Sequence, residues 1–157
     1  MKTLFVLAAT VSLLFGTALA QRSRSTQDRI VENWVAAWNS HDVNRVIPLF
    51  TNDVLYEDVT FGAVNHGSAD LRKFASFFFA AVPDMKFEVV KSFVQGKCGT
   101  IEWTFSGTDR GVYKTGKKFS VRGVSILELD HGKIARNLDF YDSATIMRQV
   151  GLLPTSQ

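Results

Sequence analysis

The sequence predicts one α+β domain in which helices come first and long antiparallel strands follow. Apolar residues recur mainly at helical spacing up to Pro83 and at alternate positions after Met85. The 157-residue chain is 46% hydrophobic and 21% charged, which is typical of a globular domain. Its single cysteine, Cys98, rules out an intrachain disulfide and is expected to be buried like a small apolar residue. This order of elements favours a curved sheet that wraps the helices.

The first twenty residues have the layout of a secretory signal peptide. Lys2 precedes an apolar run at 4–15, and Ala18-Leu19-Ala20 supply a small-x-small cleavage pattern. The run is shorter than the roughly 20 residues that cross a bilayer. We therefore expect residues 21–157 to form the mature domain, secreted to the extracellular space or to a bacterial periplasm, and not attached to a membrane.

Two helices are expected at the start of the mature domain. Ile30, Trp34 and Trp38 recur at the spacing of one helix face. A second, shorter apolar stripe extends from Val43 to Phe50. We expect this helix to end near Pro48, because proline interrupts helical hydrogen bonding.

A strand and a third helix follow. Residues 54–59 are rich in strand-forming side chains, and a glycine-containing loop separates them from Ser68. Ser68 suits the N-cap of a helix that continues to about Val82, where Pro83 ends it. The run Phe77-Phe78-Phe79 makes this helix apolar around much of its circumference, so we expect it to be sandwiched within the domain.

From Met85 onward the apolar period becomes two, which predicts antiparallel strands. Turn-forming residues separate the expected strands, which lie around 87–93, 101–105, 118–129 and 133–141. A closing helix is capped by Asp142 or Ser143 and ends at Gly151.

Five short motifs, each weak alone, occur in a specific order along the chain. They are Val82-Pro83-Asp84, Phe105-Ser106-Gly107-Thr108, Asp130-His131-Gly132-Lys133-Ile134, Tyr141-Asp142 and Gln149-Val150-Gly151-Leu152. Together they resemble the SnoaL-like polyketide cyclases of the nuclear-transport-factor-2-like superfamily. The resemblance implies a cone-shaped α+β barrel around an apolar pocket, and a homodimer formed through the outer sheet face. Because this superfamily includes isomerases, dehydratases, hydrolases, cyclases and non-catalytic binders, the activity must be inferred from the pocket.

Asp139 is the main candidate for an acid/base residue. Aspartate is a poor strand former, and this one lies inside the expected last strand. In the cyclases that the sequence resembles, the acid/base aspartate occupies this position, and an apolar pocket would raise its pKa towards neutrality. Simple alternation places Ile134, Leu138 and Phe140 on the apolar face and Asp139 on the other. The resemblance instead favours an Asp139 that faces the pocket.

The other candidate catalytic residues are Tyr56, Ser125 and His66. The cyclases place a histidine beside the aspartate, and this sequence has Ser125 there, which can donate a hydrogen bond but cannot be the same acid/base partner. Tyr56, Ser125 or Asn137 could stabilise an enolate oxygen. His66 could replace the missing histidine if its loop folds over the mouth, and otherwise it is an exposed loop residue. Asp58 is expected to cap the turn after its strand.

Aromatic side chains dominate the expected core, and a subset of them should line the pocket. The expected substrate-binding residues are Trp38, Phe78, Trp103, Asn137 and Tyr141. Few charges converge with them, so a flat apolar ligand is favoured over a sugar or phosphate. No metal-ligand spacing, glycine-rich phosphate loop or GxSxG elbow occurs, so we expect no metal and no cofactor. The net charge of +3 is too small to indicate nucleic-acid binding.

Three kinds of function remain open at this point. The first is a cofactor-free acid/base enzyme of the cyclase or isomerase type, acting on an apolar polyketide-like or steroid-like carbonyl substrate. The second is a secreted binder that uses the same pocket for a small hydrophobic ligand without chemistry. The third is a homodimeric interaction module with a filled pocket, which an open cavity of roughly a few hundred Å³ would exclude.

Overall fold

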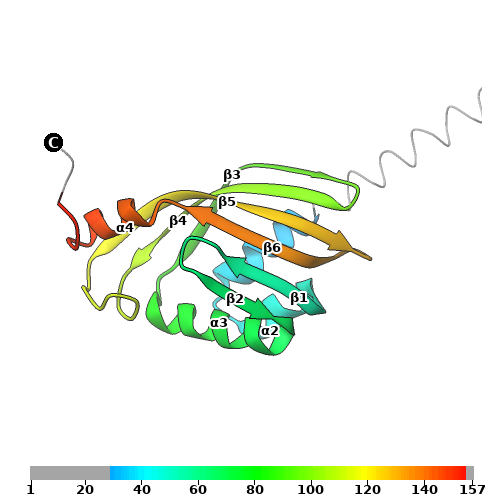
Figure 1. The fold of residues 1–157 in the computed structure, drawn as a ribbon, viewed down its shortest axis with the longest axis horizontal. Helices are drawn as coiled ribbons and strands as arrows, with labels where there is room; N and C mark the ends of the chain where they lie inside the picture. The colour runs from blue at the N-terminus through cyan, green and yellow to red at the C-terminus, as the bar shows by residue number, and fades with distance from the viewer. Residues whose placement is uncertain (1–28, 155–157) are drawn as a thin grey trace, which may run out of the picture.

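The computed structural model describes residues 29–154 as a curved sheet with helices along one side (Figure 1). The expected signal peptide lies outside the described residues. A helical segment at 29–39 comes first. The elements after it are α2 (Val43–Val46), η1 (Ile47–Leu49), β1 (Phe50–Asp58), β2 (Ala63–His66), α3 (Gly67–Ala81), β3 (Lys86–Gln95), β4 (Cys98–Thr108), β5 (Lys118–Asp130), β6 (Lys133–Tyr141) and α4 (Ser143–Gln149).

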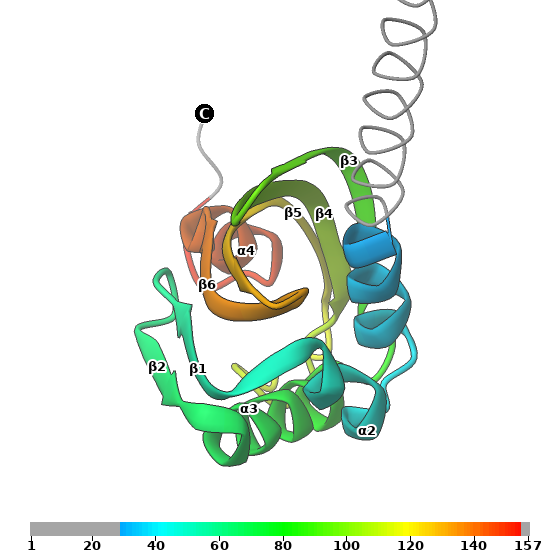
Figure 2. The same ribbon diagram turned by 90° about the vertical axis from the view of Figure 1, so that its right-hand side faces the viewer.

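The six strands have the order β2-β1-β6-β5-β4-β3. All neighbouring pairs are antiparallel except β1 and β6, which are parallel. Strands β2 and β3 form the two edges, so the sheet curls around the interior without closing into a complete barrel (Figure 2). The predicted α+β class with a mostly antiparallel, curved sheet is therefore confirmed.

The core lies between the concave face of the sheet and the helices. Trp34 packs edge-on against Phe87, with ring centroids 5.1 Å apart, and Trp38 lies 6.0 Å from the ring of Tyr56. Asn39, at the end of the first helix, donates to the Phe87 carbonyl at 2.8 Å and accepts from the Phe87 N–H at 2.7 Å. These two bonds fasten the first helix to β3. Among residues 29–154, no helix is long and apolar enough to cross a membrane.

Several local expectations differ from the structure. Helix α3 begins at Gly67, so Ser68 is not its N-cap, and the helix is not sandwiched, because its buried side chains lie on one face and Phe77 is exposed. The first strand begins at Phe50, four residues before the expected start, because the short helix stops before that residue. The expected loop at 63–66 is the edge strand β2. Cys98 is exposed rather than buried, since it starts β4 immediately after the β3–β4 turn.

A bulge decides which face of β6 turns inward. Between Ile134 and Arg136 the pairing with β5 shifts by one residue, which leaves Ala135 as an extra residue in β6. Ile134 is buried before the bulge, and Asn137 and Asp139 are buried after it. The bulge therefore lets one strand bury an apolar side chain at its start and two polar side chains further along.

Candidate active site

Asp139 is buried on the concave face of β6, where its carboxylate accepts hydrogen bonds from three side chains. Oδ1 accepts from Ser125 Oγ at 2.6 Å and from Asn137 Nδ2 at 2.8 Å, and Oδ2 accepts from the hydroxyl of Tyr56. Ser125 comes from β5 and Tyr56 from β1, the two neighbours of β6. Burial raises the pKa of Asp139, and the three hydrogen bonds oppose part of that rise.

A second buried carboxyl, Asp58, lies beside Asp139. The parallel pairing of β1 with β6 places the two residues opposite each other. Asp58 Oδ2 accepts from the Tyr141 hydroxyl at 3.0 Å, and Oδ1 accepts from the Phe61 N–H at 2.8 Å. Burial raises the pKa of Asp58 to about 6, the Phe61 hydrogen bond opposes the rise, and the charge of Asp139 adds to it. The site thus contains two coupled carboxyls, each bonded to a tyrosine.

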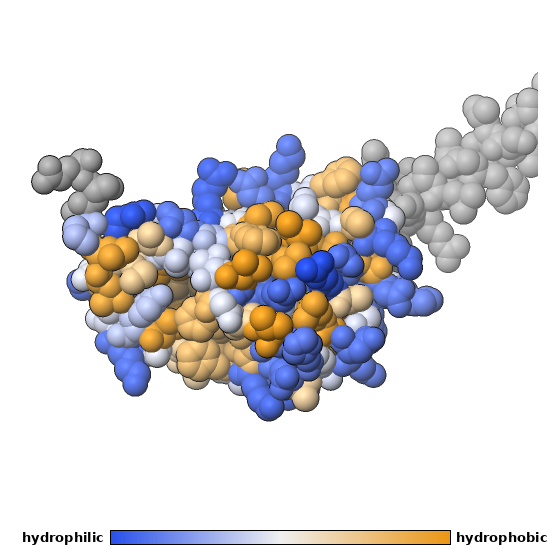
Figure 3. All heavy atoms as spheres, in the orientation of Figure 1, coloured by the Kyte–Doolittle hydropathy of each residue, from blue (hydrophilic) through white to orange (hydrophobic). Residues whose placement is uncertain are grey.

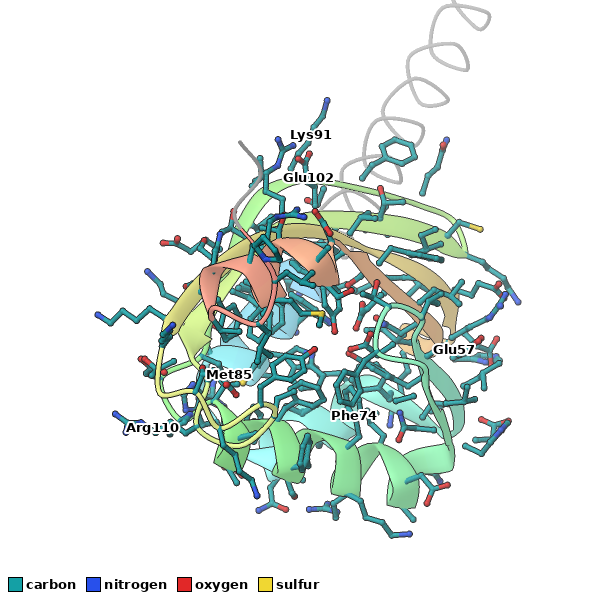
Figure 4. All side chains as sticks on the ribbon, turned by 60° about the vertical axis from the view of Figure 1, so that its left-hand side comes forward. Glu57, Phe74, Met85, Lys91, Glu102 and Arg110 are labelled. Carbon is teal, nitrogen blue, oxygen red and sulfur yellow. The ribbon has the colours of Figure 1, made fainter. Side chains whose placement is uncertain are left out.

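Both carboxyls line a small inner cavity of about 30 Å³. Its other lining residues are mostly aromatic: Trp38, Tyr56, Phe74, Phe78, Met85, Phe87, Trp103, Phe105 and Tyr141. Figure 4 shows Phe74 and Met85 among the side chains that fill the interior, whereas Lys91 and Glu102 lie on the outer side of the sheet. A cavity of this size holds roughly one water molecule or one group of similar size.

A larger outer chamber of about 230 Å³ shares Phe78, Phe105 and Tyr141 with the inner cavity. Its remaining wall consists of Thr60, Phe61, Val82, Asp109, Val112, Tyr113, Phe119, Ser143 and Ile146. This wall is mainly apolar and combines residues of the β1–β2 turn, the β4–β5 loop and α4. The outer chamber therefore offers a ligand an apolar surface that leads to the two carboxyls.

The loop between β4 and β5 forms one side of the outer chamber. Asp109 accepts hydrogen bonds from the backbone N–H of Tyr113 at 2.9 Å and from the N–H and hydroxyl of Thr115, both at 2.8 Å. The Arg110 N–H donates to the Ala81 carbonyl at 2.8 Å, which ties the loop to the end of α3. These bonds hold the loop in place over the chamber.

Comparison with known proteins places the chain in a family. A sequence profile of the SnoaL-like polyketide cyclases matches residues 28–150. The chain belongs to this family. It is also 31% identical over 111 residues to the cyclase aurE of Calcarisporium arbuscula, an alignment that covers 69% of this chain and 82% of aurE.

Solved structures with the same fold extend this comparison. A protein with a ketosteroid isomerase-like fold from Catenulispora acidiphila is 26% identical, with a TM-score of 0.72 over 79% of this chain and 93% of that one. TsrD from Streptomyces laurentii is 24% identical, with a TM-score of 0.73 over 83% of this chain and 98% of that one. The predicted SnoaL-like family and fold are confirmed.

The structure of this SnoaL-like chain brings most of the predicted site residues together. Trp38, Phe78, Trp103 and Tyr141 line the inner cavity, and Tyr56 lines it while bonding to Asp139. Ser125 and Asn137 are fully buried beside the Asp139 carboxylate and line neither the inner cavity nor the outer chamber. Their expected contact with an enolate oxygen is therefore not available, and both instead hold Asp139.

His66 does not join the site. It is exposed at the end of the edge strand β2 and lines neither the inner cavity nor the outer chamber. Because residues 63–66 pair with β1, this segment cannot fold over the mouth as a loop. The expected replacement of the cyclase histidine by His66 is thus not supported by its position.

The structure adds Asp58 as a site residue. As predicted, it caps its turn through Phe61, but it also faces Asp139 across the β1–β6 pair. The signal in the sequence was its spacing from Tyr56, since residues two apart on a strand point to the same face. Within residues 29–154, no group of three or more His, Cys, Asp or Glu side chains is arranged to hold a metal ion.

Proposed function

We propose that this SnoaL-like protein is a cofactor-free enzyme that transfers a proton at a carbon next to a carbonyl group, leading to cyclisation or isomerisation of an apolar substrate. One observation carries the proposal. Two buried carboxyls, Asp139 and Asp58, each bonded to a tyrosine hydroxyl, line one small cavity beside an apolar chamber. Desolvated carboxyls of raised pKa are effective acid/base groups near neutral pH.

In the proposed reaction, the Asp139 carboxylate removes the proton from the α-carbon. The electron pair of the broken C–H bond moves onto the carbonyl oxygen, giving an enolate. Tyr141 lines both the inner cavity and the outer chamber. When Asp58 is protonated, its O–H donates to the Tyr141 oxygen, which frees the single Tyr141 hydroxyl proton for the enolate oxygen. Thr60 fixes the Tyr141 backbone through two hydrogen bonds of 2.9 Å. Asp58, whose pKa is raised, enters the reaction protonated and returns its proton to the product at the end. Asp139 then releases the proton it removed to solvent and Asp58 takes one up, which restores both carboxyls for the next turnover.

The dimensions of the two cavities restrict the proposed substrate. The inner cavity of about 30 Å³ admits only the reacting end of a molecule. The outer chamber of about 230 Å³ lies below the roughly 300–1,000 Å³ of pockets that hold drug-sized ligands. A polyketide-like molecule of one or two rings with a 1,3-dicarbonyl end therefore suits the site better than a steroid of four rings.

The test is hydrogen–deuterium exchange at the α-carbon of small apolar ketones and 1,3-dicarbonyl compounds, followed by NMR. We expect the wild type and an Asp53→Asn control, which alters an exposed carboxyl on the same strand as Asp58, to accelerate exchange. Asp139→Asn should not. If no protein accelerates exchange while panel members still bind, the function is that of a non-catalytic binder of a small hydrophobic ligand.

We also propose that the outer face of the sheet pairs two copies of the chain. Large apolar side chains are exposed there, including Phe93, Ile126 and Phe140. In Figure 3, apolar atoms gather over the middle of the sheet. Positive and negative side chains lie beside them as the Arg122–Glu102 pair, a mixture that suits a two-fold interface. Light scattering should show a dimer that Phe140→Asp converts to a monomer; a monomeric wild type would refute this pairing.

A further inference from the structure

The side of Asp139 that faces β5 is held by a short chain of hydrogen bonds that ends at Trp103. The Trp103 Nε1–H donates to Ser125 Oγ at 2.9 Å, and Ser125 Oγ donates to Asp139 Oδ1 at 2.6 Å. An indole N–H can only donate, and a hydroxyl has a single proton. Ser125 must therefore accept from Trp103, and its own proton points to Asp139 Oδ1. The chemistry of the two ends fixes the direction of the chain.

The position of the Trp103 ring depends on Gly123. The two residues pair across β4 and β5, and a Cβ atom on residue 123 would lie 2.2 Å from Cη2 and 2.4 Å from Cζ3 of the indole. Any larger residue would displace the ring and with it the N–H that reaches Ser125. Glycine is needed here for the close approach of the ring.

We propose that Trp103, seated on Gly123, orients Ser125 so that Ser125 holds Asp139 for proton transfer, and that this tryptophan–serine pair takes the place of the histidine expected at position 125. The catalytic part of this inference rests on the proposed function. Trp103 and Ser125 are positioning residues: Ser125 is shielded from both cavities, and Trp103 reaches Asp139 through it.

This replacement has a chemical consequence. A histidine beside Asp139 would gain or lose a proton near neutral pH, whereas an indole and a hydroxyl do not. The titratable groups that face Asp139 are then Tyr56, Asp58 and Tyr141. The tryptophan–serine pair keeps a permanent hydrogen-bond donor on Asp139. It does so without adding another titrating group to the two carboxyls, Asp139 and Asp58.

The inference is tested by a double-mutant cycle on the full protein. Ser125→Ala removes the donor to Asp139, and Trp103→Phe removes only the N–H that orients Ser125. We measure the pKa of Asp139 by carboxyl-carbon NMR and the rate of α-carbon exchange across pH. Ser125→Ala should raise this pKa by about one unit, which is about tenfold in the protonation equilibrium. Trp103→Phe should produce a smaller change in the same direction, and Ser125→Thr, which keeps the hydroxyl, should restore the wild-type value.

The double variant distinguishes positioning from packing. Because Trp103 acts through Ser125, Trp103→Phe in the Ser125→Ala background should leave the pKa of Asp139 unchanged. Trp34→Phe is the matched control, since Trp34 is equally buried and its indole N–H has no hydrogen-bond partner among residues 29–154. The inference would be overturned if the pKa shifts of Ser125→Ala and Trp103→Phe added up in the double variant. It would also be overturned if Trp34→Phe shifted the pKa of Asp139 as much as Trp103→Phe does.

One further variant and two combinations of outcomes keep the result unambiguous. If Trp103→Phe does not fold, a benzothienyl-alanine at position 103 keeps both rings and removes only the N–H donor. If the pKa of Asp139 responds as expected while neither the wild type nor any variant accelerates exchange, the proposed function fails and the positioning role of the tryptophan–serine pair stands. If the wild type accelerates exchange and the pKa of Asp139 does not respond to Ser125→Ala, the positioning role of the tryptophan–serine pair fails and the proposed function stands.

Discussion

Buried carboxyls line both the inner cavity and the outer chamber, but their pKa values are shifted in opposite directions. Beside the inner cavity, burial dominates and raises the pKa of Asp58 to about 6. Burial also acts on Asp109 in the wall of the outer chamber, but the hydrogen bonds from Thr115 and Tyr113 outweigh it and hold the pKa below the usual value. Asp139 accepts three hydrogen bonds and its pKa is still raised, so the balance between burial and hydrogen bonding, rather than either alone, sets the direction of the shift.

The largest expected effect lies in the inner cavity. Asp139→Asn keeps the shape of the side chain and removes its ability to accept a proton. We expect proton transfer at the α-carbon to slow by about 10²–10⁴-fold, the usual range for a general base. Single-turnover exchange kinetics with a 1,3-dicarbonyl compound measure this, and circular dichroism controls for folding. A rate within a factor of about two of the wild type would contradict the role of Asp139.

The second effect tests the raised pKa of Asp58. Its folded-state pKa of about 6 exceeds the ordinary value of 3.8, so the folded protein binds the proton more tightly than the unfolded chain does. The associated stabilisation is present at low pH and is lost as pH rises from about 4 through about 6. Relative to Asp58→Asn, the free energy of unfolding of the wild type should therefore fall by about 3 kcal/mol over this window.

Urea denaturation of both proteins near the two ends of the window measures this difference. Asp53→Asn serves as the control, since Asp53 is exposed on the same strand. A constant difference between wild type and Asp58→Asn across pH would show that Asp58 titrates normally.

A third, smaller effect concerns the outer chamber. Asp109→Ala leaves the N–H groups of Tyr113 and Thr115 without their acceptor, so the free energy of unfolding should fall by about 2 kcal/mol. Because the loop carries Val112 and Tyr113 into the chamber wall, KM should rise more than kcat falls. The pKa values of Asp58 and Asp139 should stay as they are. A large fall in kcat with unchanged KM would mean that the outer chamber contributes to the chemical step as well as to substrate binding.

The smallest effect is expected at Lys114 in the same loop. This residue adopts a positive φ of 60°, a conformation that costs a residue with a side chain more than it costs glycine. Lys114→Gly should raise the free energy of unfolding by about 0.5 kcal/mol, since part of the gain is offset by the greater entropy of glycine in the unfolded chain. Thermal unfolding measures the change, and turnover should not alter.

Much of the fold followed from periodicity, and the exceptions have local causes. The long strands and α3 have strong apolar repeats, and their predicted positions are confirmed within a few residues. Strand β2 has only four residues and owes its existence to pairing with β1, which its own sequence does not reveal. The family resemblance and the fold that it implied are confirmed, whereas secretion stays a prediction because residues 1–20 lie outside the described range.

The site was predictable in composition more than in geometry. Alternation alone placed Asp139 on the wrong face of its strand, because the sequence does not show that Ala135 forms a bulge. The pairing of Asp58 with Tyr141 joins the first strand to the last, so no local pattern could indicate it. Ser125 was recognised as the departure from the cyclases, but its bond to Trp103 depends on the register of β4 and β5.

The parallel contact between β1 and β6 also governs when the site comes into existence. Tyr56 and Asp139 are 83 positions apart in the chain, and they meet where β1 pairs with β6. Contacts of such long sequence separation form slowly, because the entropy of closing a long loop must be overcome first. During synthesis, the proposed acid/base centre therefore cannot assemble until β6, which carries Asp139, has emerged, and any chain that stops before β6 lacks it altogether.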